Sequence, residues 1–146
     1  MRVDTPGDGY FGRAFQEGQR RMTGADAVIA GPGAASSADR IGQYDIGGYS
    51  AAAITRDSSQ DLLTASLVSR PDAQTAHAME FRRALRTGDP GDVDLASGRV
   101  YLLFAIGRSG QTTSLSRHAE RGAVEIDLEA GSSLAPPLAP PAIRVA

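Results

Sequence analysis

The sequence predicts an all-β protein, specifically an immunoglobulin-like antiparallel β-sandwich. Short apolar or alternating segments recur roughly every ten residues, which is the spacing typical of sandwiches. Clusters of Gly, Pro, Asp and Ser separate these segments and predict turns. No stretch combines the apolar period of a helix with a convincing cap. The chain has 146 residues, enough for one domain with one core.

Residues 5–12 are rich in glycine and match the pattern G-x-G-x-x-G from Gly7 to Gly12. This pattern binds dinucleotides only where a strand delivers the glycines to the start of a helix. Only six residues precede Gly7, and one of them is Pro6. We therefore expect a glycine-rich turn, followed by a mixed polar segment over residues 13–21.

Seven later segments are expected as β-strands. They span residues 27–30, 44–48, 49–56, 62–69, 75–85, 99–107 and 123–128. The clearest is 75–85, where His77, Met79 and Phe81 share one face. Residues 62–69 place apolar groups on both faces, so a helix is an open alternative there. Thr64 and the Arg70-Pro71 pair that ends the segment favour a strand. The most apolar run, 99–107, predicts a buried strand.

Composition excludes several classes of function. The net charge of −2 gives no electrostatic case for nucleic acid or an anionic membrane. Without cysteine the chain has no disulfide, thiolate nucleophile, iron–sulfur cluster or c-type haem. We find no signal peptide and no transmembrane segment in this chain.

Catalytic motifs are also scarce, so we expect a binding or electron-transfer domain and not an enzyme on its own. There is no G-x-S-x-G elbow, and the chain has two histidines, without the spacing of a zinc site. The acidic groups at 89–94 and 125–127 lie in a turn or on an alternating strand face. We interpret them as solvated.

Haem b needs only two axial ligands and an apolar slot, and the chain can supply both. Met22 precedes the strand at 27–30 and His118 precedes the strand at 123–128, so they can face each other across a haem as metal ligands. His77 and Met79 share one strand face and cannot reach opposite sides of a flat macrocycle. We expect the apolar lining to come from Phe81, Leu103 and Phe104.

Five sequence segments, taken in order, resemble the DOMON domain. They are Met22-x-Gly24-Ala25-Asp26-Ala27-Val28-Ile29-Ala30, Asp57-x-x-Gln60-Asp61-Leu62, Phe81-Arg82-Arg83-x-Leu85-x-Thr87-Gly88-Asp89-x-x-Asp92, Leu103-Phe104-Ala105-x-Gly107 and His118-x-x-x-Arg121-Gly122. This superfamily includes the cytochrome domain of cellobiose dehydrogenase and domains of plant and algal proteins linked to transmembrane cytochrome b. The resemblance covers residues 20–130. It leaves 1–19 as an N-terminal segment holding a remnant strand, and 131–146 as a Pro/Ala-rich tail or linker.

The resemblance implies an immunoglobulin-like sandwich that binds haem or sugars outside the cell. In the haem branch, the axial methionine and histidine correspond to Met22 and His118. The implied role is one-electron transfer to or from a partner redox domain, either a flavin dehydrogenase or a transmembrane cytochrome b. Family members carry several strands before the methionine, so the resemblance also implies a sandwich that is incomplete at its N-terminus.

One alternative stays open: a DOMON-like module that binds a sugar or another ligand without haem. Met22 would then be a packing residue and His118 a rim residue. An apolar cleft between these two residues would favour haem. A shallow polar groove with stacked tyrosines would favour sugar.

Overall fold

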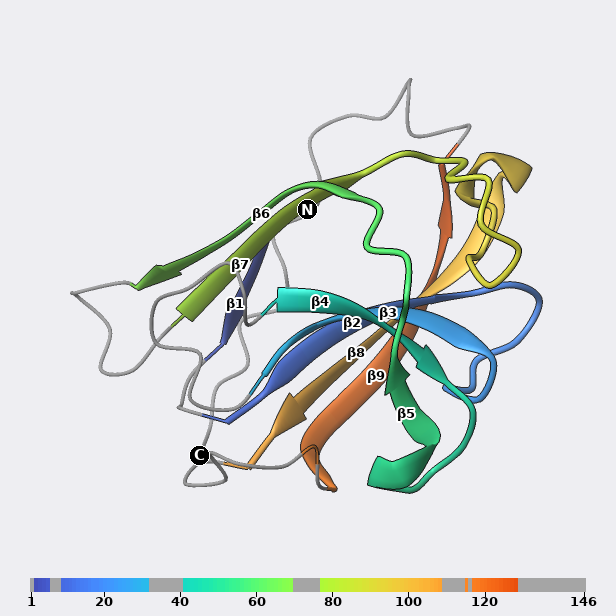
Figure 1. Cartoon of the computed structure of the whole chain (residues 1–146). Helices are drawn as coiled ribbons and strands as arrows, with labels where there is room; N and C mark the ends of the chain where they lie inside the picture. The colour runs from blue at the N-terminus through green and yellow to red at the C-terminus, as the bar shows by residue number, and fades with distance from the viewer. Residues whose placement is uncertain are drawn as a thin grey trace.

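A computed structural model describes residues 2–5, 9–31, 41–69, 77–108, 115 and 117–128. The described residues form β-strands and two short 3-10 helices, η2 (Ala51–Ala53) and η3 (Leu95–Ser97) (Figure 1). The strands are β1 (Arg2–Thr5), β2 (Phe11–Gln16), β3 (Ala25–Ala30), β4 (Ile41–Ile46), β5 (Ile54–Arg56), β6 (Leu62–Ser69), β7 (His77–Arg83), β8 (Arg99–Gly107) and β9 (His118–Asp127). The prediction of an all-β, sandwich-like fold is confirmed.

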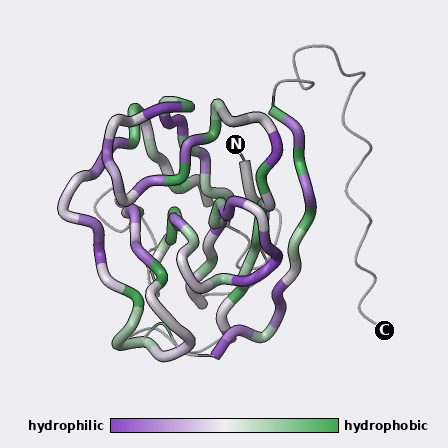
Figure 2. Tube along the Cα trace, turned by 90° about the vertical axis from the view of Figure 1, so that its right-hand side faces the viewer, coloured by the Kyte–Doolittle hydropathy of each residue, from purple (hydrophilic) through white to green (hydrophobic). Residues whose placement is uncertain are grey.

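The strands form two antiparallel sheets, which lie as separate layers in Figure 1. The smaller sheet has the order β1-β7-β6, and the larger has the order β5-β4-β3-β2-β8-β9. Every neighbouring pair is antiparallel. Antiparallel sheets can bury one face and expose the other. Figure 2 shows hydrophobic and hydrophilic residues interspersed along the chain.

The main core lies between the two sheets. Phe11, Phe15 and Val28 contribute from the larger sheet, while Met79 and Phe81 contribute from β7. Met79 is fully buried, as the alternation along residues 75–85 predicted for that face. A second apolar cluster covers part of the opposite face of the larger sheet and includes Ala14, Ala27 and Ile29.

Strand β2 lies within residues 1–19, where a remnant strand was expected, but no sequence pattern located it there. It pairs with β3 on one side and β8 on the other, in the middle of the larger sheet. Phe11 and Phe15 are buried, but Gly12, Arg13 and Ala14 separate them and hide the alternation. Gly12 suits a crowded position, because a Cβ there would lie 3.2 Å from the Ile29 side chain. The segment expected to be mixed and polar, 13–21, therefore begins with the last four of the six residues of a central strand.

Other boundaries shift by a few residues. Strand β9 begins at His118, five residues earlier than the predicted strand at 123–128, and β5 is shorter than the predicted 49–56, because η2 precedes it. Strand β1, paired with β7, also lies within residues 1–19, so this segment holds two strands where one remnant strand was expected. Residues 75–76, the side chain of His77 and the predicted tail at 131–146 lie outside the described residues.

Three charged side chains are buried between the sheets. Arg83 on β7 forms an ion pair with Asp26 on β3 and a second with Asp92, with its Nη2 3.3 Å from Asp92 Oδ2. All three side chains are 3% exposed. The interpretation of Asp92 as solvated was wrong. Leu95 of η3 is buried in the core and Val93 packs against it, so the preceding Asp92 is also drawn inside.

Candidate functional site

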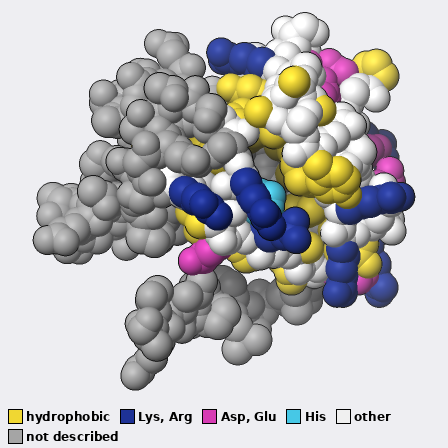
Figure 3. All heavy atoms as spheres, turned by 90° about the horizontal axis from the view of Figure 1, so that it is seen from below, with side chains coloured by type: hydrophobic (Ala, Val, Ile, Leu, Met, Phe, Trp, Pro, Cys, Tyr) yellow, Lys and Arg dark blue, Asp and Glu magenta, His cyan; other side chains and the backbone are white. Residues whose placement is uncertain are grey.

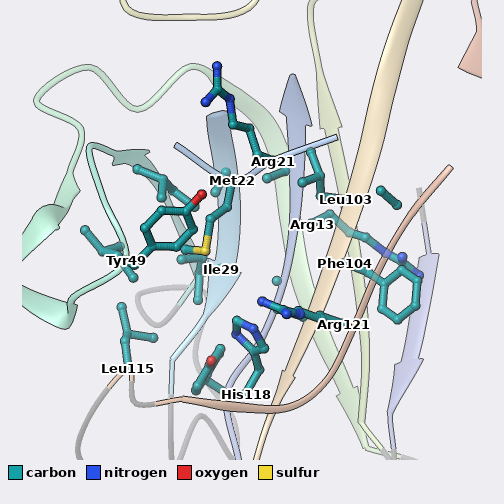
Figure 4. Close-up of a pocket in the computed structure, with 18 of the residues that line it drawn as sticks. Arg13, Arg21, Met22, Ile29, Tyr49, Leu103, Phe104, Leu115, His118 and Arg121 are labelled. Atoms are coloured by element: carbon teal, nitrogen blue, oxygen red, sulfur yellow. The ribbon is translucent and has the colours of Figure 1, made fainter. Parts of the chain in front are cut away.

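A cavity of about 720 Å³ lies on the outer face of the larger sheet, on the side away from the small sheet (Figure 4). Its floor consists of small and aliphatic side chains from three strands, namely Ala14 of β2, Ala27 and Ile29 of β3, and Leu103 and Ala105 of β8. Three segments form its walls: residues 20–22, residues 49–51, and residues 115–123 with gaps. The small floor residues leave the depth that a bulky ligand needs.

Met22 is held by the turn between β2 and β3. Gly18 and Gly24 have φ values of 72° and 79°, in the region that favours glycine. The turn closes through the Ala25 N–H, which donates to the Met22 carbonyl at 3.0 Å, and the Gly24 N–H, which donates to the Ile46 carbonyl at 2.7 Å. Met22 is half-buried against the second apolar cluster, and its side chain points into the cavity beside Tyr49 (Figure 4).

His118 is the first residue of β9 and pairs with Gly107 of β8, next to a register shift. Its ring points into the same cavity from the opposite wall (Figure 4). Burial lowers the pKa of His118, and the positive charges of Arg121 and Arg117 lower it further. The imidazole therefore favours its neutral form, in which one ring nitrogen carries a free lone pair that can bind a metal.

The three predicted lining residues have different positions. Leu103 forms part of the cavity floor. Phe104 borders the cavity, but its ring lies under the Arg13 guanidinium at 5.2 Å from its centroid, apart from Met22 and His118 in Figure 4. Phe81 does not border the cavity. It is 3% exposed in the core between the sheets, so its assignment to the ligand site needs correction.

Four exposed arginines and one exposed tyrosine at the cavity were missed, together with the less exposed Arg13 and Tyr10. Arg20, Arg21, Arg117 and Arg121 border the cavity, as does Tyr49, which is 74% exposed. Among the residues that the structure describes, no Asp or Glu borders it. The sequence did carry a signal, because the arginines flank the two predicted ligands closely along the chain.

A conventional metal site built from several ligands is absent from the described part of the chain. No group of three or more His, Asp or Glu side chains there could hold a metal ion, and the chain has no cysteine. In the same residues, no helix is long and apolar enough to cross a membrane. The cavity offers instead one thioether and one imidazole.

Comparison with known proteins does not identify the family: no protein-family model, curated protein or solved structure matches this chain. The fold and the cavity define an all-β domain with a ligand-sized site on the outer face of its larger sheet.

Proposed function

We propose that this protein is a b-type haem-binding electron-transfer domain with Met22 and His118 as axial ligands. The observation that supports this proposal is their position. Met22 and His118 lie far apart in the sequence, yet their side chains point into one cavity from different walls. Axial ligands must approach a macrocycle from opposite faces, which two residues on different segments can do and two neighbours on one strand face cannot.

The cavity suits a haem in size and polarity. Its volume of about 720 Å³ lies within the roughly 300–1,000 Å³ usual for cofactor sites. The floor is apolar, as a porphyrin ring requires, and it includes Ile29, Leu103 and Ala105. The open cleft between Met22 and His118 matches the feature expected to favour haem.

The chain's own residues would bind and tune this group. His118, with its lowered pKa, would offer a neutral nitrogen, and Met22 would offer a sulfur. Ile29 and Leu103 would exclude water from the ring faces, while arginines at the cavity edge would pair with the propionates. A haem held by Met and His supplies a one-electron couple whose potential the thioether raises, with no open position for oxygen chemistry.

The ligand pair and the order of the motifs lead us to propose the haem-binding branch of the DOMON superfamily. The partner would be a redox domain, a flavin dehydrogenase or a transmembrane cytochrome b. The full-length protein would act outside the cell or at its membrane.

A sugar-binding module without haem is the alternative, and Tyr49 is the observation that favours it. Its ring is 74% exposed at the cavity edge, where it could stack on a sugar. The rest of the lining fits a sugar less well. In the described part of the chain it has four exposed cations, an apolar floor and no carboxylate to accept hydrogen bonds from hydroxyl groups.

Haem reconstitution tests the proposal. The parent should take up one haem and give sharp low-spin bands, with a thioether-to-iron charge-transfer band in the oxidised form. Met22→Leu keeps the apolar volume but removes the sulfur, so the charge-transfer band should disappear. His118→Gly should lose the low-spin spectrum, and added imidazole should restore it.

Met79→Leu is the matched control, because Met79 lies in the core between the sheets, away from the cavity. Its spectrum should equal that of the parent. A folded parent that takes up no stoichiometric haem, or a Met22→Leu spectrum identical to the parent spectrum, would rule out this axial pair. Saturable binding of an oligosaccharide at the cavity by a parent that takes up no haem would favour the alternative.

A further inference from the structure

The cavity mouth concentrates positive charge on a chain that is acidic as a whole. We define the arginine rim as Arg20, Arg21, Arg117 and Arg121. All four side chains are exposed and border the cavity. The net charge of the chain is −2, so this surface opposes the overall charge. Figure 3 shows basic side chains gathered around the histidine on this face.

The rim arginines have no acidic partner among the described residues. Arg21 binds the Gln19 amide oxygen, and the Arg20 guanidinium lies 5.5 Å from the centroid of the Tyr101 ring. Glu17 and Glu120 are the closest carboxylates in the sequence, yet neither borders the cavity. By contrast, Arg86 and Arg99, exposed elsewhere on the surface, both lie within 4 Å of carboxylates.

A haem would neutralise only part of this charge. Its two propionates carry two negative charges, so at least two of the four positive charges of the arginine rim would stay uncompensated at the mouth. The open mouth is also where a cofactor in this cavity would come closest to a partner. Charge of one sign around such an opening steers partners of the opposite sign.

We propose that the arginine rim is the docking surface for an acidic protein, the redox partner of this domain. Its role in electron transfer rests on the proposed haem function. An acidic protein surface fits the rim better than a lipid bilayer does. The rim encloses a hollow, whereas a membrane-binding surface presents several apolar side chains to the bilayer. Among the described residues that border the cavity, Tyr49 is the one large apolar residue that is exposed.

The test uses the apoprotein and a fluorescein-labelled oligoglutamate peptide, with binding followed by fluorescence anisotropy at low salt. The parent should bind, and added salt should weaken binding. The Arg117→Gln/Arg121→Gln double variant should bind on the order of tenfold more weakly. Repeating the titration with haem-reconstituted protein should give weaker binding that is still measurable.

The Arg86→Gln/Arg99→Gln double variant is the matched control. It removes the same charge from exposed arginines outside the cavity, and breaking such surface pairs costs little stability. It should bind the peptide as tightly as the parent does, in contrast to the rim variant. Equal weakening in the two double variants, or no binding by the parent, would overturn the proposal.

Vesicles of phosphatidylcholine and phosphatidylserine supply the remaining comparison. Parent protein that sediments with these vesicles but does not bind the peptide would assign the rim to a membrane and overturn the proposal of a protein partner. These measurements need no haem, so they separate failure of the docking surface from failure of the haem site.

Discussion

Arg83 of β7 donates a hydrogen bond across the core to Asp26 of β3, so a buried ion pair joins the two sheets. Asp92 pairs with the other guanidinium nitrogen of the same arginine. Two carboxylates therefore share one cation, and each of the three side chains is only 3% exposed to water. The Phe15 ring, with its centroid 5.6 Å from the guanidinium carbon, completes the enclosure.

The arginine should matter more to stability than either acid. Arg83→Leu leaves two buried carboxylates without a cation, and we expect it to lower the free energy of unfolding by about 3–5 kcal/mol. Asp26→Asn keeps the Arg83–Asp92 pair and should cost less. Urea denaturation at neutral pH measures both, and a smaller loss in Arg83→Leu than in Asp26→Asn would contradict this ranking.

Acid should partly rescue Arg83→Leu. Burial raises the pKa of Asp26 even in the parent, while the Arg83 hydrogen bond and charge oppose this shift. Removing the arginine should raise the pKa further, so the native state binds more protons than the unfolded state, and stability falls as pH rises through that range. The urea midpoint of Arg83→Leu, relative to the parent, should therefore be higher near about pH 5 than at pH 7. A constant difference would argue against buried, ionised carboxylates.

The pKa of His118 should lie below the ordinary histidine value. Burial lowers it first, and Arg121 and Arg117 lower it further. Because the unfolded chain then binds more protons, the stability contributed by this group is lost as pH falls through the ordinary histidine range. An NMR titration of the apoprotein measures the pKa directly. Arg121→Gln should raise it, and Arg99→Gln, a change on the same sheet outside the cavity, should not.

Gly122 should tolerate no side chain. A Cβ at this position would overlap the ring of Phe104, which pairs with it across β8 and β9. Gly122→Ala should lower the free energy of unfolding by about 1–3 kcal/mol. Phe104→Leu should offset most of that loss in the double variant. Additive losses in a double-mutant cycle, measured by thermal unfolding, would show that the ring does not cause the strain.

Gln60 should hold the loop between β5 and β6 in place. Its amide oxygen accepts from the Gln43 N–H at 2.9 Å, and its amide nitrogen donates to the Asp57 carbonyl at 2.8 Å. Gln43 is fully buried, so Gln60→Ala should leave its N–H unsatisfied and cost about 1–3 kcal/mol. The exposed neighbour Ser58 provides the control, since Ser58→Ala should be near neutral. Hydrogen exchange at the Gln43 amide should also become faster.

Several residues of the DOMON-like motifs have structural roles here. Asp26, Arg83 and Asp92 form the buried ion pairs, and Gln60 and Asp61 bind Gln43. The resemblance therefore draws on the frame of the fold as well as on the cavity. Residues with such structural roles carry no information about which ligand the cavity binds.

The sequence alone determined the β character of the chain, because alternation and turn residues act locally. Strands β6, β7 and β8 were predicted near their observed positions for this reason. It also limited the available chemistry, since a chain without cysteine and with two histidines offers few metal ligands. Met22 and His118 followed from that short inventory.

The tertiary structure decided which strand faces meet. Alternation shows that a strand has two faces but does not show which of them another sheet covers. Phe81 was expected at the ligand site, yet the small sheet turns it into the core. The cavity instead lies on the outer face, where segments distant in sequence, among them the β2–β3 turn and the start of β9, place Met22, His118 and the arginine rim together. Strand pairing across the whole chain determines that arrangement, and no local pattern records it.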